Sequence, residues 1–382
     1  MHSIGRMAER KRRGELADKR SVASSVGGAV ALQPIAEGQR LLAPERGAVD
    51  DARRRRCEVG SSVALCLGTI GFVPVVNKQI LAADGPLRAA PLSMTAVQLA
   101  GAFVVFATLT LCQYARRGPP GKRALRRRAR RLLPLGLAFG LKVGASNVGL
   151  GLVSTELHVL LGATEVVWTA LFAFFVDGER PSAGGAAALV GCAAGAALAA
   201  GAPSPGGPRP TPFGVAANLV APCLQGLVVG LLRRGARVEL VAGRASYVEF
   251  TALKLGFAVA AAAPLAVLRE GAGPVVAAAA AAGRETRVAA ATLLTAAVQL
   301  SFTALASVAS ANTVGIVAAA KVVPQWLLAA AAAPEAAASP GHVLGAGVLA
   351  ASAALWAATG NAPRRAAPPR RTLYDAALRP GR

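Results

Sequence analysis

Long apolar runs constrain the fold of this chain more than any other feature of its sequence. Runs of about 18–25 residues recur between short polar breaks from residue 61 to residue 359, and each is long enough as a helix to cross about 30 Å of hydrocarbon. Only 16% of the residues are charged, whereas soluble domains carry about 25%. The sequence therefore predicts an all-α, polytopic membrane protein.

We expect ten transmembrane helices. Alanine dominates several of them and favours insertion only weakly, so helices eight to ten are the least sharply defined. The predicted spans are 61–82, 92–115, 132–150, 153–176, 184–201, 212–232, 246–268, 288–309, 313–333 and 341–359.

The distribution of basic residues predicts which face of the membrane each loop occupies. The net charge is +23, and 33 of the 42 lysines and arginines fall in the two tails and in alternate loops. By the positive-inside rule, this asymmetry requires an even number of crossings with both termini cytosolic. Aromatic residues make up 4% of the chain, which leaves few stacking platforms for nucleic acid, so no nucleic-acid partner is expected.

The chain divides into four predicted parts. Residues 1–58 and 362–382 are basic tails, expected to be disordered in the cytosol and suited to contact anionic membrane lipid. Residues 59–203 and 204–361 each hold five predicted helices. Because five is odd, two related halves of this kind would have inverted orientations in the membrane.

An internal repeat supports this division. When the sequence is shifted by 156 residues, Glu165-Val166-Val167 aligns with Lys321-Val322-Val323. Inverted repeats are typical of transporters, whose substrate site lies near the midplane between the halves. Further matches at this offset are Ser154 with Ser310, Leu171 with Leu327, Glu179 with Glu335, Gly185 with Gly341 and Gly191 with Gly347.

Five short motifs, taken in order, resemble those of the triose-phosphate and nucleotide-sugar transporter family within the drug/metabolite transporter superfamily. The resemblance covers about residues 61–360. It implies two inverted five-helix halves and exchange of nucleotide sugars or phosphorylated metabolites. The motifs are Pro74-Val75-Val76-Asn77-Lys78, Asn147-Val148, Gly178-Glu179-Arg180-Pro181-Ser182, Glu270-Gly271, and Asn312-Thr313 followed by Lys321.

Departures from the family pattern affect the expected substrate. The resemblance implies that plastid phosphate translocators hold phosphate with a lysine in helix four and a Lys-Arg pair in helix nine. Here Gly162 and Val322 stand at two of these three positions, and only Lys321 remains. We therefore favour an antiporter of nucleotide sugars, of the UDP-sugar type, over a plastid-type sugar-phosphate or organic-acid translocator. A membrane receptor or scaffold that transports nothing is the alternative from another class.

Ionisable residues inside the apolar spans are functional candidates because a charge at the membrane centre costs at least about 2.5 kcal/mol. Lys321 is expected to bind the substrate phosphate, or else to pair structurally with an acid. Glu165, which aligns with Lys321 at the repeat offset, is expected either to pair with Lys321 in the empty carrier or to pack within helix four. The remaining predicted substrate-binding residues are Lys142 as a second cation (or paired with Glu156), Lys254, Tyr247 near the base or sugar, and Asn147 and Thr313 from the family motifs.

The sequence predicts neither enzymatic activity nor a cofactor or metal. The chain contains no GxxxxGK[ST] or HExxH motif and no CxxC pair, which are the signatures of phosphate-binding loops and common metal sites. The expected partner is a small anionic solute, and the sequence leaves open whether the protein forms a homodimer. The resemblance implies a Golgi, endoplasmic reticulum or plastid membrane. No plastid address is visible, so a Golgi or endoplasmic reticulum membrane is expected, with the plastid envelope as the alternative.

Overall fold

The computed structural model describes Cys57, 60–83, Leu87, 90–162, 164–178, 181–201, 211–321, Leu328 and 340–359. Apart from Cys57, the predicted tails lie outside this range, as do Val322, Glu179 and Glu335. Helices are the only regular structure in the part of the chain that is described. This confirms the all-α fold class.

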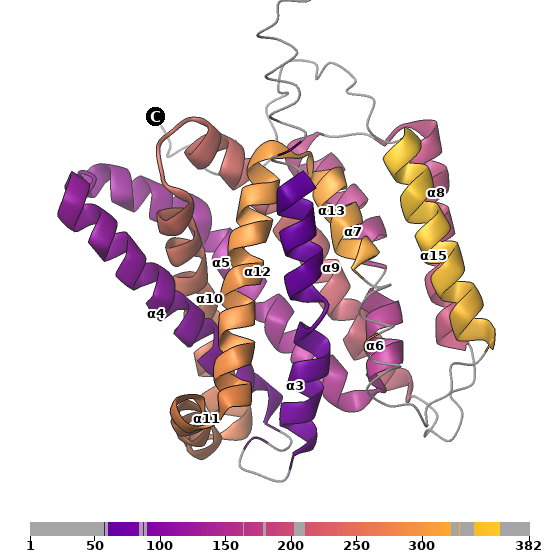
Figure 1. The fold of residues 1–382 in the computed structure, drawn as a ribbon, viewed down its shortest axis with the longest axis horizontal. Helices are drawn as coiled ribbons and strands as arrows, with labels where there is room; N and C mark the ends of the chain where they lie inside the picture. The colour runs from indigo at the N-terminus through magenta and orange to yellow at the C-terminus, as the bar shows by residue number, and fades with distance from the viewer. Residues whose placement is uncertain are drawn as a thin grey trace, which may run out of the picture. The chain divides into compact units, whose positions relative to one another are not determined.

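Figure 1 shows the helices of the described residues. They are α3 (Val73–Ala82), α4 (Pro91–Arg117), α5 (Lys122–Leu152), α6 (Thr155–Gly162), α7 (Glu165–Phe172), α8 (Ala183–Gly201), α9 (Pro212–Ala236), α10 (Tyr247–Glu270), α11 (Ala272–Arg284), α12 (Thr286–Val308), α13 (Ala311–Ala320) and α15 (Pro340–Thr359), with π-helical turns η2 (Ala173–Asp177) and η3 (Arg237–Val241).

Within the described residues, six helices are long and apolar enough to cross a membrane. Large apolar side chains on their outer surfaces are exposed, for example Leu111 at 66% and Leu268 at 83%, as expected where lipid replaces water around the protein. These features identify a polytopic membrane protein, while the total of ten helices stays a prediction. The six are Gly60–Leu81, Pro91–Arg117, Lys122–Leu152, Pro212–Val241, Tyr247–Glu270 and Thr286–Val308.

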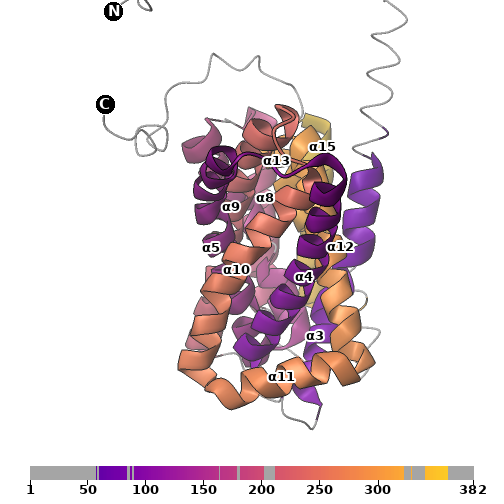
Figure 2. The same ribbon diagram turned by 90° about the vertical axis from the view of Figure 1, so that its left-hand side faces the viewer.

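The helices differ from the predicted spans at several places. Helix α5 begins at Lys122, ten residues before the predicted span, because lysine and arginine favour helix although they are not apolar. The fourth predicted span is two helices, α6 and α7, rather than one. Helix α11 was not predicted, and it runs across the end of the bundle between α10 and α12 (Figure 2).

Glycine permits the close packing of α8 against α15, which lie side by side in Figure 1. A Cβ atom on Gly195 would lie 2.9 Å from the carbonyl oxygen of Gly345 and 3.0 Å from Leu349. Small residues at such contacts let the backbones of membrane helices approach one another, which is how these helices gain packing energy in lipid. Helix α4 packs in a similarly extensive way against α10, and α5 against α9.

Candidate functional site

A buried ion pair lies at the centre of the polar interior. Lys321 directly follows α13 and is 8% exposed, and Glu165 begins α7 and is 2% exposed. The Lys321 Nζ atom lies 2.8 Å from Glu165 Oε2 and donates a hydrogen bond to it. The structure thus brings together the two residues that align at the repeat offset, and the predicted pairing is observed.

The break between α6 and α7 places Glu165 at the start of a helix. Helix α6 ends at Gly162, and the Thr164 hydroxyl donates to the Leu161 carbonyl oxygen at 2.8 Å across the break. A carboxylate in the first turn of a helix is stabilised by the unpaired N–H groups and dipole at that end. Broken helices of this type form substrate sites in several transporters.

Two further polar atoms of α7 are buried beside the ion pair without a partner in the described residues. They are Glu165 Oε1 and the hydroxyl of Thr169, one turn along the helix. The approach of α13 to α7 depends on Gly315, where a Cβ atom would lie 2.5 Å from Thr169 Cγ2. Buried acceptors and donors that lack partners are costly, so this face of α7 is suited to contact a polar solute.

Lys142 supplies a second cation close to this pair. It is half-buried, and its charge interacts with those of Lys321 and Glu165. No hydrogen bond or ion pair joins Lys142 to the residues whose side chains are described; the side chain of Glu156, its alternative partner, lies outside them. The structure therefore brings Glu165 and Lys321 into contact and places Lys142 within electrostatic range of both.

His158 lies in the same region and is hydrogen-bonded. Its Nδ1 atom is 2.6 Å from Asn218 Oδ1, and its Nε2 atom is 3.5 Å from the Ser146 hydroxyl. Asn218 also donates to the Gly149 carbonyl oxygen at 2.9 Å, which holds α9 against α5. The ring orientation of His158 is therefore fixed by α5 and α9.

Asn147 belongs to a buried amide network. Asn77 Nδ2 donates to Asn147 Oδ1 at 3.2 Å, Asn147 Nδ2 donates to Thr95 Oγ1 at 2.7 Å, and Gln98 Nε2 donates to Asn77 Oδ1 at 2.9 Å. These bonds tie α3, α4 and α5 together. Sequence reasoning missed Gln98 and Thr95, although polar residues within an apolar span were a usable signal.

Lys254 is buried among neutral partners on α10 and α12. It is 1% exposed, and its Nζ atom donates to Gln299 Oε1 at 2.8 Å and to Thr303 Oγ1 at 3.3 Å. The same atom lies 5.3 Å from the centre of the Phe139 ring, a favourable position for a cation. Lys254 does not pair with Glu249, which instead binds Arg128.

Tyr247 and Thr313 lie apart from the ion pair. Tyr247 is 42% exposed, and its hydroxyl is 2.9 Å from that of Ser307. The Thr313 N–H group donates to the Ser310 hydroxyl at 3.1 Å at the start of α13. Eight residues of helix separate Thr313 from Lys321, which corresponds to a rise of about 12 Å.

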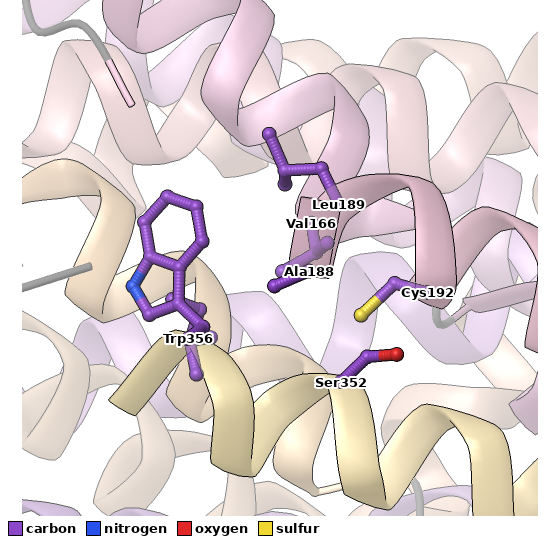
Figure 3. A pocket seen from close by; sticks show the side chains of 7 residues that line it. Val166, Ala188, Leu189, Cys192, Ser352 and Trp356 are labelled. Carbon is purple, nitrogen blue, oxygen red and sulfur yellow. The ribbon is translucent and has the colours of Figure 1, made fainter. Parts of the chain in front are cut away.

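An apolar crevice lies between α7, α8 and α15 (Figure 3). Its walls include Val166, Cys192, Ser352 and Trp356, and it is too narrow to admit a water molecule. Neither Lys321 nor Glu165 lines it. It is a gap in helix packing next to the polar site rather than a chamber for a solute.

Several polar contacts recur at the repeat offset of 156 residues. The contact between Asn147 and Thr95 is repeated by Thr303 and Thr251, whose hydroxyls are 3.3 Å apart. Lys78 donates to the Leu150 carbonyl oxygen at 2.9 Å, and Arg233, near the equivalent position of the second half, donates to the Ala306 carbonyl oxygen at 2.7 Å. Leu150 and Ala306 are themselves 156 residues apart.

Comparisons with known proteins inform the fold alone. No family model matches the chain, and no curated protein matches it either. Among solved structures, 27 chains match. One, described only as the crystal structure of a protein, has a TM-score of 0.53 and 18% sequence identity, over 78% of this chain and 95% of its own length.

Proposed function

We propose that the chain is a membrane antiporter of nucleotide sugars, of the UDP-sugar type, that works by alternating access. The observation that carries the proposal is the buried ion pair between Glu165 and Lys321. Ionisable groups inside a membrane bundle are costly and mark substrate paths in transporters. On this proposal, ten transmembrane helices form two inverted five-helix halves.

Contacts at the repeat offset support the two-halves arrangement. If the halves are related by a pseudo-two-fold axis, a residue on that axis touches its own equivalent. Glu165 and Lys321 are 156 residues apart and form an ion pair. Helix α4 packs extensively against α10, and α8 against α15. In each pair, adding 156 to the residue numbers of the first helix gives nearly the residue range of the second.

Substrate binding would exchange one partner of the ion pair for another. In the empty carrier, Glu165 compensates the Lys321 ammonium, which lowers the cost of burying it. A phosphate oxygen of the substrate would take the place of the carboxylate, and Lys142 would supply a second cation for a diphosphate. The hydroxyl of Thr169, which has no partner among the described residues, would donate to the same group.

A sugar-phosphate translocator of the plastid type is the second candidate. It is favoured by the position of Lys142, which restores a second cation near Lys321 although Gly162 replaces the helix-four lysine of that group. Two cations within one site suit a compact dianion as well as a diphosphate. Substrate competition separates the two candidates.

Equilibrium exchange in proteoliposomes tests the proposal. Vesicles loaded with UMP should take up labelled UDP-sugar, and unlabelled triose phosphate should compete only weakly. Replacing both members of the pair, in Glu165→Gln with Lys321→Gln, should abolish exchange while the protein stays folded. Arg284→Gln, which replaces an exposed residue of α11, is the control and should exchange normally.

Three outcomes would count against this function. Exchange of triose phosphate for inorganic phosphate without UDP-sugar uptake would favour the second candidate. Lack of exchange with every phosphorylated solute in correctly folded protein would favour a receptor or scaffold. Normal exchange in the double variant would remove the ion pair from the mechanism.

Orientation and compartment belong to the same proposal. We place both termini in the cytosol, because most basic residues then lie on the cytosolic face, and the protein in a Golgi or endoplasmic reticulum membrane. Protease protection of terminal epitope tags in sealed microsomes tests this orientation. Tags that are cut on opposite faces would exclude an even number of crossings.

A further inference from the structure

The first turns of α5 carry cations on two faces, and the inward face is neutralised. Residues 122–131 include seven lysines and arginines and no acid. Arg131 Nη1 lies 2.7 Å from Glu239 Oε1, and Arg128 pairs with Glu249. Glu239 is 1% exposed, so these two arginines hold α5 against η3 and α10.

The outward face of the same turns is exposed and carries charges that no described acid neutralises. The exposed cations between residues 122 and 130 lie on one side of the helix, because residues three or four apart share a helix face. They form a stripe about 12 Å long, which we call the α5 stripe. Arg116 and Arg117 at the end of α4 are also exposed and adjoin the stripe across the Gly118–Gly121 turn. The stripe consists of Lys122, Arg123, Arg126, Arg127 and Arg130.

The stripe continues directly into a lipid-facing surface. Leu133, Leu137 and Leu141 follow Arg130 at helical spacing and are 39%, 36% and 41% exposed. Leucines exposed on a membrane-spanning helix face acyl chains, so the cations one turn beyond them lie at the depth of lipid headgroups. The basic side chains of the stripe are already exposed at this level, so they reach the headgroups without having to extend out of the hydrocarbon.

We infer that the α5 stripe is a binding surface for anionic phospholipid headgroups, with polyphosphorylated inositol lipids bound more tightly than phosphatidylserine. Clusters of four to eight lysines and arginines at the membrane surface attract such lipids. Arginine also forms paired hydrogen bonds with phosphate. Since Arg128 and Arg131 on the same turns hold η3 and α10, bound lipid will stabilise this end of the bundle against unfolding.

Binding of short-chain lipids to the full-length protein in neutral detergent tests the inference. The probes are dioctanoyl phosphatidylinositol bisphosphate, dioctanoyl phosphatidylserine and free inositol trisphosphate. The test variant combines Arg126→Gln, Arg127→Gln and Arg130→Gln. The matched control removes three exposed arginines elsewhere, in Arg269→Gln, Arg284→Gln and Arg287→Gln.

We expect the inositol lipid to bind the α5 variant at least tenfold more weakly than wild type, because each cation at the surface contributes about 1 kcal/mol. The control should bind normally, and wild-type affinity should fall with salt. Equal losses in both variants, or none in the α5 variant, would refute the inference. Tight binding of inositol trisphosphate alone would show a site for soluble anions instead, and capture of an acidic peptide without lipid binding would show a protein partner.

Discussion

Separating the members of the Glu165–Lys321 pair is the perturbation with the largest expected effect. The two charges lie 2.8 Å apart and are nearly fully buried. At an effective dielectric constant of about 20, their attraction is about 6 kcal/mol, and the cost of removing both from water offsets much of it. The net contribution of the pair to the free energy of unfolding is therefore small, whereas one buried charge left without its partner destabilises the folded protein.

Three variants reveal this difference. Glu165→Gln and Lys321→Gln should each lower the free energy of unfolding by about 3–5 kcal/mol, because each leaves an uncompensated buried charge. The double variant should lie within about 2 kcal/mol of wild type, since two amides can bond to each other. The coupling energy from this double-mutant cycle then reports the pair directly.

Unfolding by sodium dodecyl sulfate in mixed micelles, followed by circular dichroism, measures these stabilities. Exchange in proteoliposomes of the same four proteins separates stability from function. The double variant should be stable and inactive. The reasoning is refuted if both single variants unfold like wild type, or if the double variant loses, relative to wild type, the sum of the two single losses.

Three further predictions concern packing and polar contacts elsewhere. Gly226→Ala should lower the free energy of unfolding by about 1–3 kcal/mol, because the added Cβ atom would lie 2.5 Å from the Trp168 carbonyl carbon. The control in the same micelle assay is Gly347→Ala, whose added Cβ atom meets no atom within 4 Å. Asn147→Leu should cost about 2–4 kcal/mol by leaving buried partners unsatisfied, and an unchanged unfolding curve would contradict the amide network. Glu249→Gln should cost about 1–2 kcal/mol by breaking the contact with Arg128, with the exposed Glu285→Gln as control, and equal stabilities would show that this contact is weak.

The membrane character of the fold could be predicted because hydropathy is a local property. A run such as the one in α4 or α12 identifies itself without knowledge of its neighbours, and the predicted ends agree with the observed helices to within a few residues. Helix α11 was missed because an alanine-rich segment between two spans has the composition of a loop and of a helix alike.

Candidate residues for the site were predictable because a charge in an apolar run is conspicuous. Lys321, Glu165 and Lys142 were identified in this way, and the repeat offset of 156 suggested that the first two meet. Their separation of 2.8 Å and the break before Glu165 were not visible, because the 153–176 segment has the length of one membrane span and contains no proline. Tyr247 and Thr313, which were predicted to bind substrate, lie apart from the ion pair, and their role in binding stays a prediction.

The sequence by itself determined that the chain crosses a membrane, roughly where it does so, and which buried charges need an explanation, since each of these follows from the transfer energy of single segments. Only the tertiary structure decided which partners satisfy those charges. Lys321 has a carboxylate, Lys254 has an amide and a hydroxyl, and Lys142 has none in the described residues. Partners come from helices far apart in the chain, so the packing of the bundle rather than local composition assigns them.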